Sequence, residues 1–212
     1  MSAEPERESA TREDGARAGA DGRLRCPWGL SAEDYVVYHD AEWGRAVHGD
    51  DALYERLSLE AFQSGLSWLT ILRRREGFRA AFAGFRIERV AAFSEEDEER
   101  LLADRRIIRN RAKIRAAVAN ARAAAELGEG GLDALVWSHA PDADRPAPRG
   151  TRDVPAITPE STALAKALKK RGFRFVGPTT VYATMQACGL VNDHLADCWV
   201  RDHMPGGAGG SG

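Results

Sequence analysis

Apolar residues recur along most of the chain at intervals of three and four, the spacing of amphipathic helices. Capping residues, Pro at first helical positions and Gly just past the ends mark several boundaries. We expect helices from a cap at Asp50 or Asp51 to before Gly65, from about Trp68, over 95–108, 110–127 and 132–138, from Thr158-Pro159 to Gly172, and from Gly177-Pro178 to near Gly189. Alternation typical of strands is nearly absent, so the predicted fold class is all-α.

The two ends of the chain differ in composition from the part between them. Residues 1–24 are polar and rich in Gly, Ala, Glu and Arg, so we expect a disordered N-terminal extension. Residues 205–212 are Gly-rich and predict a flexible tail. Residues 25–204 then form one folded domain of two helical lobes, in which the proline-rich stretch 140–157 is a loop.

Charge and composition narrow the class of protein. The 212 residues are 43% hydrophobic and carry a net charge of −2, which arises in residues 1–24 from six acidic and four basic side chains. Charge over the whole chain therefore does not indicate a nucleic-acid partner. Three cysteines make a disulfide framework unexpected. No apolar run approaches the ~20 residues of a membrane helix and no signal region opens the chain, so we expect a cytoplasmic protein without membrane association.

Four side chains have the chemistry of a metal site. His194 and Cys198 are four residues apart, so a helix would put them on one face. Cys26 and His39 lie near the other end of the folded part, thirteen residues apart. Two thiolates and two imidazoles complete the closed tetrahedral shell of a structural zinc ion. The spacing leaves open the alternative of scattered buried cysteines and ordinary histidines.

A glycine-rich turn joins the last two predicted helices and carries basic residues. The turn contains an apolar-Gly-x-x-Thr pattern that includes Gly177, Thr179 and Thr180. The basic residues Lys169 and Lys170, and then Gly172, precede this pattern. The pattern resembles a helix–hairpin–helix, in which backbone N–H groups at a helix start bind DNA phosphate. A plain helical hairpin with a solvated basic end explains it equally well. Further basic clusters, suggesting local phosphate contact, are Arg73–Arg75 and Arg105, Arg106, Arg109, Arg111, Lys113 and Arg115.

One acidic residue is out of place in the hydrophobic pattern. Glu60 lies in LSLEAFQSGLSW, a run that otherwise looks like a core helix, and a buried carboxylate is usually paired, exposed or functional. Aromatic residues accumulate around it in the sequence: Trp28, Tyr35, Tyr38, Trp43 and Trp68. One hypothesis is a flat pocket that stacks a base while a carboxylate contacts its edge. The alternative is an ordinary core with an exposed Glu60.

Several stretches of the chain resemble 3-methyladenine DNA glycosylase I, a family of the helix–hairpin–helix glycosylase superfamily. They are RCPWG, YVVYHDAEWG, LSLEAFQSGLSWLTILRRRE, IIRNRAKI, ALKKRGFRFVGPTTVYATMQACGLVNDH and the final DC. They cover residues 25–199 in order and at consistent spacing. The resemblance implies excision of 3-methyladenine from alkylated double-stranded DNA by hydrolysis of the N-glycosidic bond, by a protein that we expect to be monomeric.

The resemblance also implies roles for individual residues. Cys26, His39, His194 and Cys198 match the family's zinc ligands, one Zn²⁺ per chain, and Glu60 matches the carboxylate that contacts the methylated base. Base-stacking aromatics correspond to Trp28, Tyr38 and Trp68, with Tyr35 nearby. Gln63–Leu66 matches the loop that enters the duplex, with Gly65 in its turn and Leu66 as the plug.

Two further residues bear on mechanism. Thr179 stands where strand-cleaving relatives of the superfamily carry a Schiff-base lysine, so we expect a monofunctional glycosylase without lyase activity. Asp193 adjoins His194 and lies too close to the hairpin to match the superfamily's usual aspartate, so it is not assigned that role. The competing hypotheses are a zinc-clipped DNA-binding module without activity and a purely structural helical protein. Glu60 among aromatics argues against the first, and release of free base from methylated DNA would separate all three.

Overall fold

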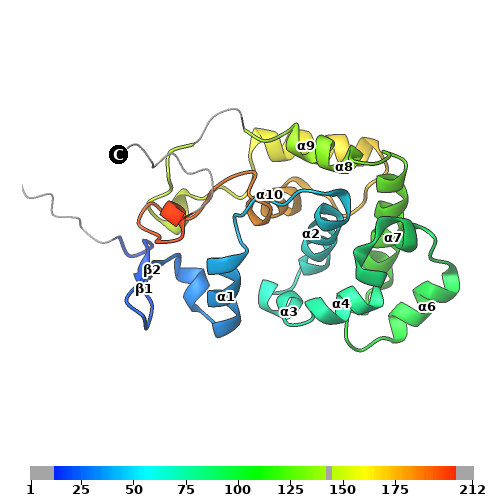
Figure 1. Ribbon diagram of the computed structural model, residues 1–212, viewed down its shortest axis with the longest axis horizontal. Coiled ribbons are helices and arrows are strands. Elements are labelled where there is room, and N and C mark those ends of the chain that lie inside the picture. The colour runs from blue at the N-terminus through cyan, green and yellow to red at the C-terminus, as the bar shows by residue number, and fades with distance from the viewer. Residues whose placement is uncertain (1–11, 142–144, 204–212) are drawn as a thin grey trace, which may run out of the picture.

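Helices make up most of the computed structural model, which describes residues 12–141 and 145–203 (Figure 1). The helices are α1 (Glu33–Ala41), α2 (Asp50–Gln63), α3 (Trp68–Leu72), α4 (Arg75–Ala81), α5 (Ile87–Ala91), α6 (Glu95–Ala103), α7 (Arg111–Ala125), α8 (Gly131–Trp137), α9 (Pro159–Lys170) and α10 (Pro178–Ala187). Short 3₁₀ turns occur at η1 (Pro27–Leu30), η2 (Ala83–Phe85), η3 (Thr151–Asp153) and η4 (Arg201–His203). Strands β1 (Arg17–Ala18) and β2 (Leu24–Arg25) pair antiparallel, Arg17 with Arg25 and Ala18 with Leu24. The predicted all-α class is confirmed.

Two helix ends differ from the prediction. Gly49, with φ of 92°, precedes α2 in place of an aspartate cap. Asp50 and Asp51 instead accept hydrogen bonds from the backbone N–H groups of Asp133 and Ile87, each at 2.8 Å, and thereby tie α2 to α8 and to the start of α5. The helix predicted over 95–108 ends at Ala103, because the Asp104 carboxylate accepts the backbone N–H of Arg106 and turns the chain (2.9 Å).

The hydrophobic core surrounds α7. This helix packs against α2, α5 and α6, and α10 packs against α9 and α2. Alanine and other small side chains on the buried face of α7 allow this close approach, and larger apolar side chains fill the space between the helices. A second, smaller cluster forms where both ends of the described chain meet (Figure 1), and it contains Ala16, Cys26, Leu195, Cys198 and Val200.

The prediction of disorder over residues 1–24 is wrong for residues 12–24. Arg12 pairs with Asp153 at 3.0 Å, and the Asp14 backbone carbonyl accepts the Thr151 N–H at 2.9 Å. Ala16 is buried in the smaller cluster. These partners come from the loop expected over 140–157, so composition within residues 12–24 contains no signal of them. Residues 1–11 and the tail predicted over 205–212 lie outside the described residues.

Candidate metal centre and base-binding cavity

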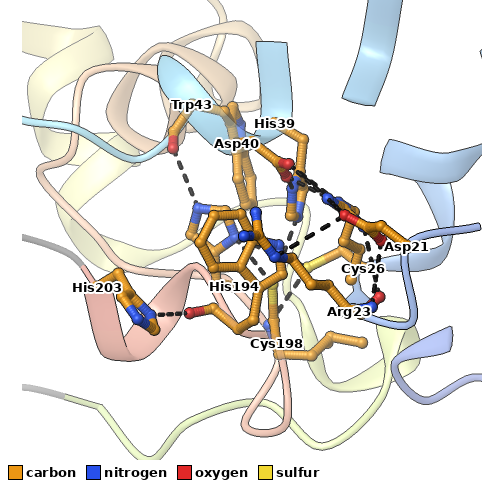
Figure 2. A network of polar contacts seen from close by, with 12 residues as sticks. Asp21, Arg23, Cys26, His39, Asp40, Trp43, His194, Cys198 and His203 are labelled. Atoms are coloured by element: carbon orange, nitrogen blue, oxygen red, sulfur yellow. Dashed lines mark hydrogen bonds and ion pairs between the residues drawn. The ribbon is translucent and has the colours of Figure 1, made fainter. Parts of the chain in front are cut away.

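The four side chains with metal-ligand chemistry meet in the smaller cluster, although two come from each end of the chain (Figure 2). Cys26, His39, His194 and Cys198 are all buried, and their ligand atoms lie within 4.8 Å of one another. Cys198 Sγ is 3.5 Å from both His39 Nε2 and His194 Nδ1, and Cys26 Sγ is 3.9 Å from His194 Nδ1. Tetrahedral zinc with bonds of about 2.3 Å to sulfur and 2.0 Å to nitrogen requires S···N separations of about 3.5 Å. The cluster therefore fits one metal ion.

Acceptors behind the two imidazoles orient them toward the sulfurs. His39 Nδ1 donates to Asp40 Oδ1 at 2.8 Å, and His194 Nε2 donates to the Trp43 carbonyl at 3.1 Å (Figure 2). Because a carboxylate and a carbonyl only accept, each ring keeps its proton on the outer nitrogen and turns a lone pair inward. Metal-binding histidines in proteins are held in this way.

Neighbouring groups stabilise the negatively charged forms of Cys198 and Asp40. Hydrogen bonding from the Cys26 thiol lowers the pKa of Cys198, and the thiolate is the form that binds metals. Asp40 in turn accepts from the buried Arg25 guanidinium at 2.8 Å. Arg25 also donates to Asp21 at 2.7 Å, so residues of the ordered N-terminal segment support the ligand set.

A cavity of about 360 Å³ lies beside the metal cluster and contains the predicted base-binding residues. Its aromatic wall comes from η1, α1 and α3. Trp28 meets Tyr35 edge-on with ring centroids 5.6 Å apart, and Tyr38 lies 5.5 Å from Trp68. The Tyr35 hydroxyl accepts the Leu69 backbone N–H at 2.8 Å, which fixes α1 against α3. The residues lining the cavity are Cys26, Trp28, Tyr35, Tyr38, Trp43, Glu60, Gln63, Trp68, Thr151, Val154, Ala183, Gln186, Asp193 and Leu195.

Glu60 reaches this cavity from the interior of α2 and is only 7% exposed. Removal from water raises the pKa of Glu60 to about 8, partly offset by the charge of Arg56. Burial likewise raises the pKa of Tyr38, which also faces the charge of Glu60. The cavity thus combines aromatic surfaces with the carboxyl group of Glu60, which has no ion-pair partner among the described residues.

The segment after Glu60 forms an exposed turn with an exposed leucine at its tip. Gly65 has φ of 80°, and the Leu66 N–H donates to the Gln63 carbonyl at 2.6 Å. Leu66 is 41% exposed although leucine is usually buried. Since α2, this turn and α3 are consecutive, Glu60, Leu66 and Trp68 are joined through a few residues of backbone.

The predicted hairpin is a tight connection between α9 and α10. Lys169, Lys170 and Gly172 are exposed at the end of α9, and Gly172 has φ of 90°. Gly177 precedes α10 without a side-chain cap, and Thr179, in the first turn, is exposed. First-turn backbone N–H groups without a side-chain cap can receive an anion.

The two other basic clusters are largely engaged within the protein. The ion pairs are Arg73–Asp34, Arg75–Glu42, Arg106–Asp104, Arg111–Glu99 and Arg115–Glu98. Lys113 is buried. The sequence hypothesis of phosphate contact by these clusters is therefore weakened for most members, because carboxylates or backbone carbonyls of the protein already bind them.

Sequence reasoning missed part of the cavity wall. Asp193 is buried there and accepts from Tyr182, Gln186 and Arg145, with the Gln186 bond at 2.9 Å. Thr151 and Val154 come from the loop over 140–157, whose lack of periodicity contains no signal of such a role. Trp43, noted only as an aromatic neighbour, lines the cavity and also supplies the carbonyl behind His194.

A mostly helical fold here holds a cavity that combines aromatic side chains with the buried carboxyl group of Glu60, beside an S₂N₂ cluster. Such a cavity suits a planar, polar ring. The methyladenine glycosylase family model matches residues 28–202, and this chain belongs to that family. DNA-3-methyladenine glycosylase 1 of Escherichia coli (strain K12) is 46% identical over 179 residues, covering 82% of this chain and 95% of the relative. DNA-3-methyladenine glycosylase of Haemophilus influenzae is 44% identical over 181 residues, covering 82% and 96%.

Solved structures agree with this assignment. The structure of 3-methyladenine DNA glycosylase I from Staphylococcus aureus, which addresses recognition of 3-methyladenine, is 34% identical with a TM-score of 0.78. The match covers 83% of this chain and 95% of that one. Among residues 12–141 and 145–203, every helix is too short or too polar to cross a lipid bilayer.

Proposed function

We propose that this protein excises 3-methyladenine from alkylated double-stranded DNA by hydrolysing the N-glycosidic bond. The observation that supports it best is the buried Glu60 in a cavity walled by Trp28, Tyr35, Tyr38 and Trp68. A flipped base stacks on aromatic rings while its exocyclic amine donates to the carboxylate. A protein that only binds DNA needs no such cavity, and the family membership supports the same activity.

Cleavage of this glycosidic bond does not require a general acid to protonate the leaving base. Methylation at N3 makes the adenine cationic, so it departs as a neutral base when the glycosidic bond breaks. An ionised Glu60 stabilises that cation in the cavity, and unmodified adenine gains less from the charge. The sugar develops positive charge as the bond breaks, and fixed negative groups, including DNA phosphates, stabilise it electrostatically before water attacks.

DNA contact is assigned to two loops. The exposed Leu66, presented by the Gly65 turn, fills the gap that the extruded nucleotide leaves in the duplex. Phosphates bind at the hairpin, through Gly172, Gly177 and the backbone at Thr179, with Lys169 and Lys170 beside them. Because Thr179 offers no amine for a Schiff base, the enzyme is monofunctional.

The metal cluster holds one Zn²⁺ ion in this proposal. Cys26 and His39 from one end of the domain and His194 and Cys198 from the other would hold it, and the donor set and spacing support that choice. A bound zinc ion supplies cross-linking of the two ends and no chemistry on the substrate. The domain, residues 25–204, acts as a cytoplasmic monomer, and residues 12–24 support its zinc end.

Release of free base from methylated DNA tests the function. Double-stranded DNA carrying a radiolabelled methyl group on adenine N3 is incubated with the protein, and the ethanol-soluble base is identified by chromatography. We expect 3-methyladenine release with strands left uncut until alkali is added. Tight binding to the same DNA without base release would support a damage-binding module instead.

A further inference from the structure

Lys113 points into the protein from a helix that otherwise presents its basic residues to solvent. It lies near the start of α7 and is 9% exposed. Its ammonium group donates to the backbone carbonyls of Phe62 at 2.9 Å and Ser64 at 2.6 Å. Loss of water lowers the pKa of Lys113. Among the described residues no carboxylate pairs with it, so its hydrogen bonds go to the turn that ends in Leu66.

Asn120, also on α7, forms hydrogen bonds to the backbone of the α9–α10 hairpin. Its side chain is 1% exposed, and its amide group binds both the N–H and the carbonyl of Arg174 in the hairpin. Nδ2 donates to the Arg174 carbonyl at 3.0 Å, and Oδ1 accepts the Arg174 N–H at 2.7 Å. The next residue, Phe175, has φ of 56°, a conformation that a bulky residue rarely adopts without support. Asn120 therefore holds the hairpin where its backbone is most constrained.

The two residues are seven positions apart, which is two helical turns, so both lie on the same face of α7, about 10 Å apart along its axis. This helix lies in the core beside α2 (Figure 1). We propose that Lys113 and Asn120 are positioning residues through which α7 fixes the spacing between the Leu66 turn and the α9–α10 hairpin. A base can be extruded only if the plug and the phosphate contacts engage the same stretch of duplex at once.

The inference rests on the proposed function, in which both loops contact DNA. Base release by the unmodified protein tests that function separately, so failure of one is distinguishable from failure of the other. The alternative for Lys113 is stability alone, because a cation near the last carbonyls of α2 stabilises any helix. The experiments must therefore separate a role in DNA engagement from a role in folding.

The variants are Lys113→Met, which keeps the stem and removes the donor, and Asn120→Leu, which keeps the size and removes both hydrogen bonds. The matched control is Val118→Ala, which removes buried methyl groups from the same helix but no hydrogen bond to either loop. If either fails to fold, Lys113→Gln, which removes the charge and shortens the side chain by one bond, and Asn120→Asp, which removes the donor, replace the first two. All are compared at a temperature where each is folded and binds metal fully.

We expect Lys113→Met to lower single-turnover excision from duplex DNA about tenfold, as for loss of a hydrogen bond from a charged donor. Affinity for free 3-methyladenine should not change. Combined with Leu66→Ala, it should add almost no further loss, since both remove the same plug. Asn120→Leu should weaken duplex binding and flatten its dependence on salt, because phosphate contacts are lost.

Two results would overturn the inference. In the first, the losses of excision rate in Lys113→Met and Leu66→Ala add up in the double variant, and the duplex affinity of Asn120→Leu keeps the salt dependence of the unmodified protein. The other is an equal loss of excision in Val118→Ala at a similar fall in melting temperature, which would assign both residues to stability alone.

Discussion

Arg56 lies one helical turn before Glu60 on α2, yet its guanidinium pairs with Glu42 at 3.2 Å and leaves Glu60 without an ion pair among the described residues. Arg75 donates to the same Glu42 carboxylate. The acidic group that stays buried and unpaired is thus the one that lines the cavity. Its pKa of about 8 is the consequence, since the effect of burial outweighs the attraction of the Arg56 charge.

The first prediction concerns stability against pH. Folding raises the pKa of Glu60 from 4.5 to about 8, so between these values the folded protein keeps a proton that the unfolded chain releases. Stability therefore falls as pH rises from 4.5 to 8 and is constant above that. The loss is about 3 kcal/mol at pH 7, from 1.36 kcal/mol for each pH unit above 4.5.

Glu60→Gln removes this titration. Its unfolding free energy should equal that of the unmodified protein near pH 4.5 and exceed it increasingly up to pH 8, measured by denaturant unfolding of the metal-loaded proteins. Glu129→Gln, at an exposed position, is the control and should show no such trend. A constant difference across pH would mean that Glu60 is ionised in the free protein.

The second prediction concerns excision by the same variant. Loss of a hydrogen bond to a charged group, roughly 1.5–3 kcal/mol, corresponds to a ten- to hundredfold slower release of 3-methyladenine at pH 8. For the unmodified enzyme, kcat/KM should rise with pH up to about 8 as Glu60 ionises, and the variant should lose that rise. Near-normal release by folded Glu60→Gln would place base recognition elsewhere.

The third prediction concerns the metal cluster. Elemental analysis of freshly purified protein should give about one zinc per chain. Cys198→Ala should lose the ion and about 3–5 kcal/mol of stability, because the two ends of the domain are then no longer joined. Cys188→Ala, at a buried cysteine outside the cluster, should keep the ion. Less than half an equivalent of zinc in the unmodified protein would contradict the assignment.

The fourth prediction separates DNA docking from base recognition. Lys170→Ala should weaken duplex binding and reduce its salt dependence, since one phosphate contact is lost. Leu66→Ala should slow excision from duplex more than from single-stranded DNA, which has no gap to fill. Both should bind free 3-methyladenine normally. An equal loss of free-base affinity would show that these residues act on the cavity and not on the duplex.

The sequence by itself determined several of the helices and the residue types of the site. Helical periodicity, the Thr158-Pro159 start and the Gly177-Pro178 start are set by interactions within a few residues, so α9 and α10 could be predicted closely. The metal-ligand residue types and the misfit of Glu60 in an apolar helix were also visible locally. Their roles came from the resemblance to a family, since spacing alone left both alternatives open.

Tertiary structure decided which partners the charged side chains bind and which segments of the chain lie in contact. Lys113 and Arg115 are alike in sequence, but one donates to backbone carbonyls in the core and the other pairs with Glu98 at the surface. Residues 12–24 look disordered by composition, yet Arg12 and Asp14 have partners far along the chain, Asp153 and Thr151. Burial, pairing and pKa depend on neighbours brought together by the path of the whole chain, and no local pattern encodes that path.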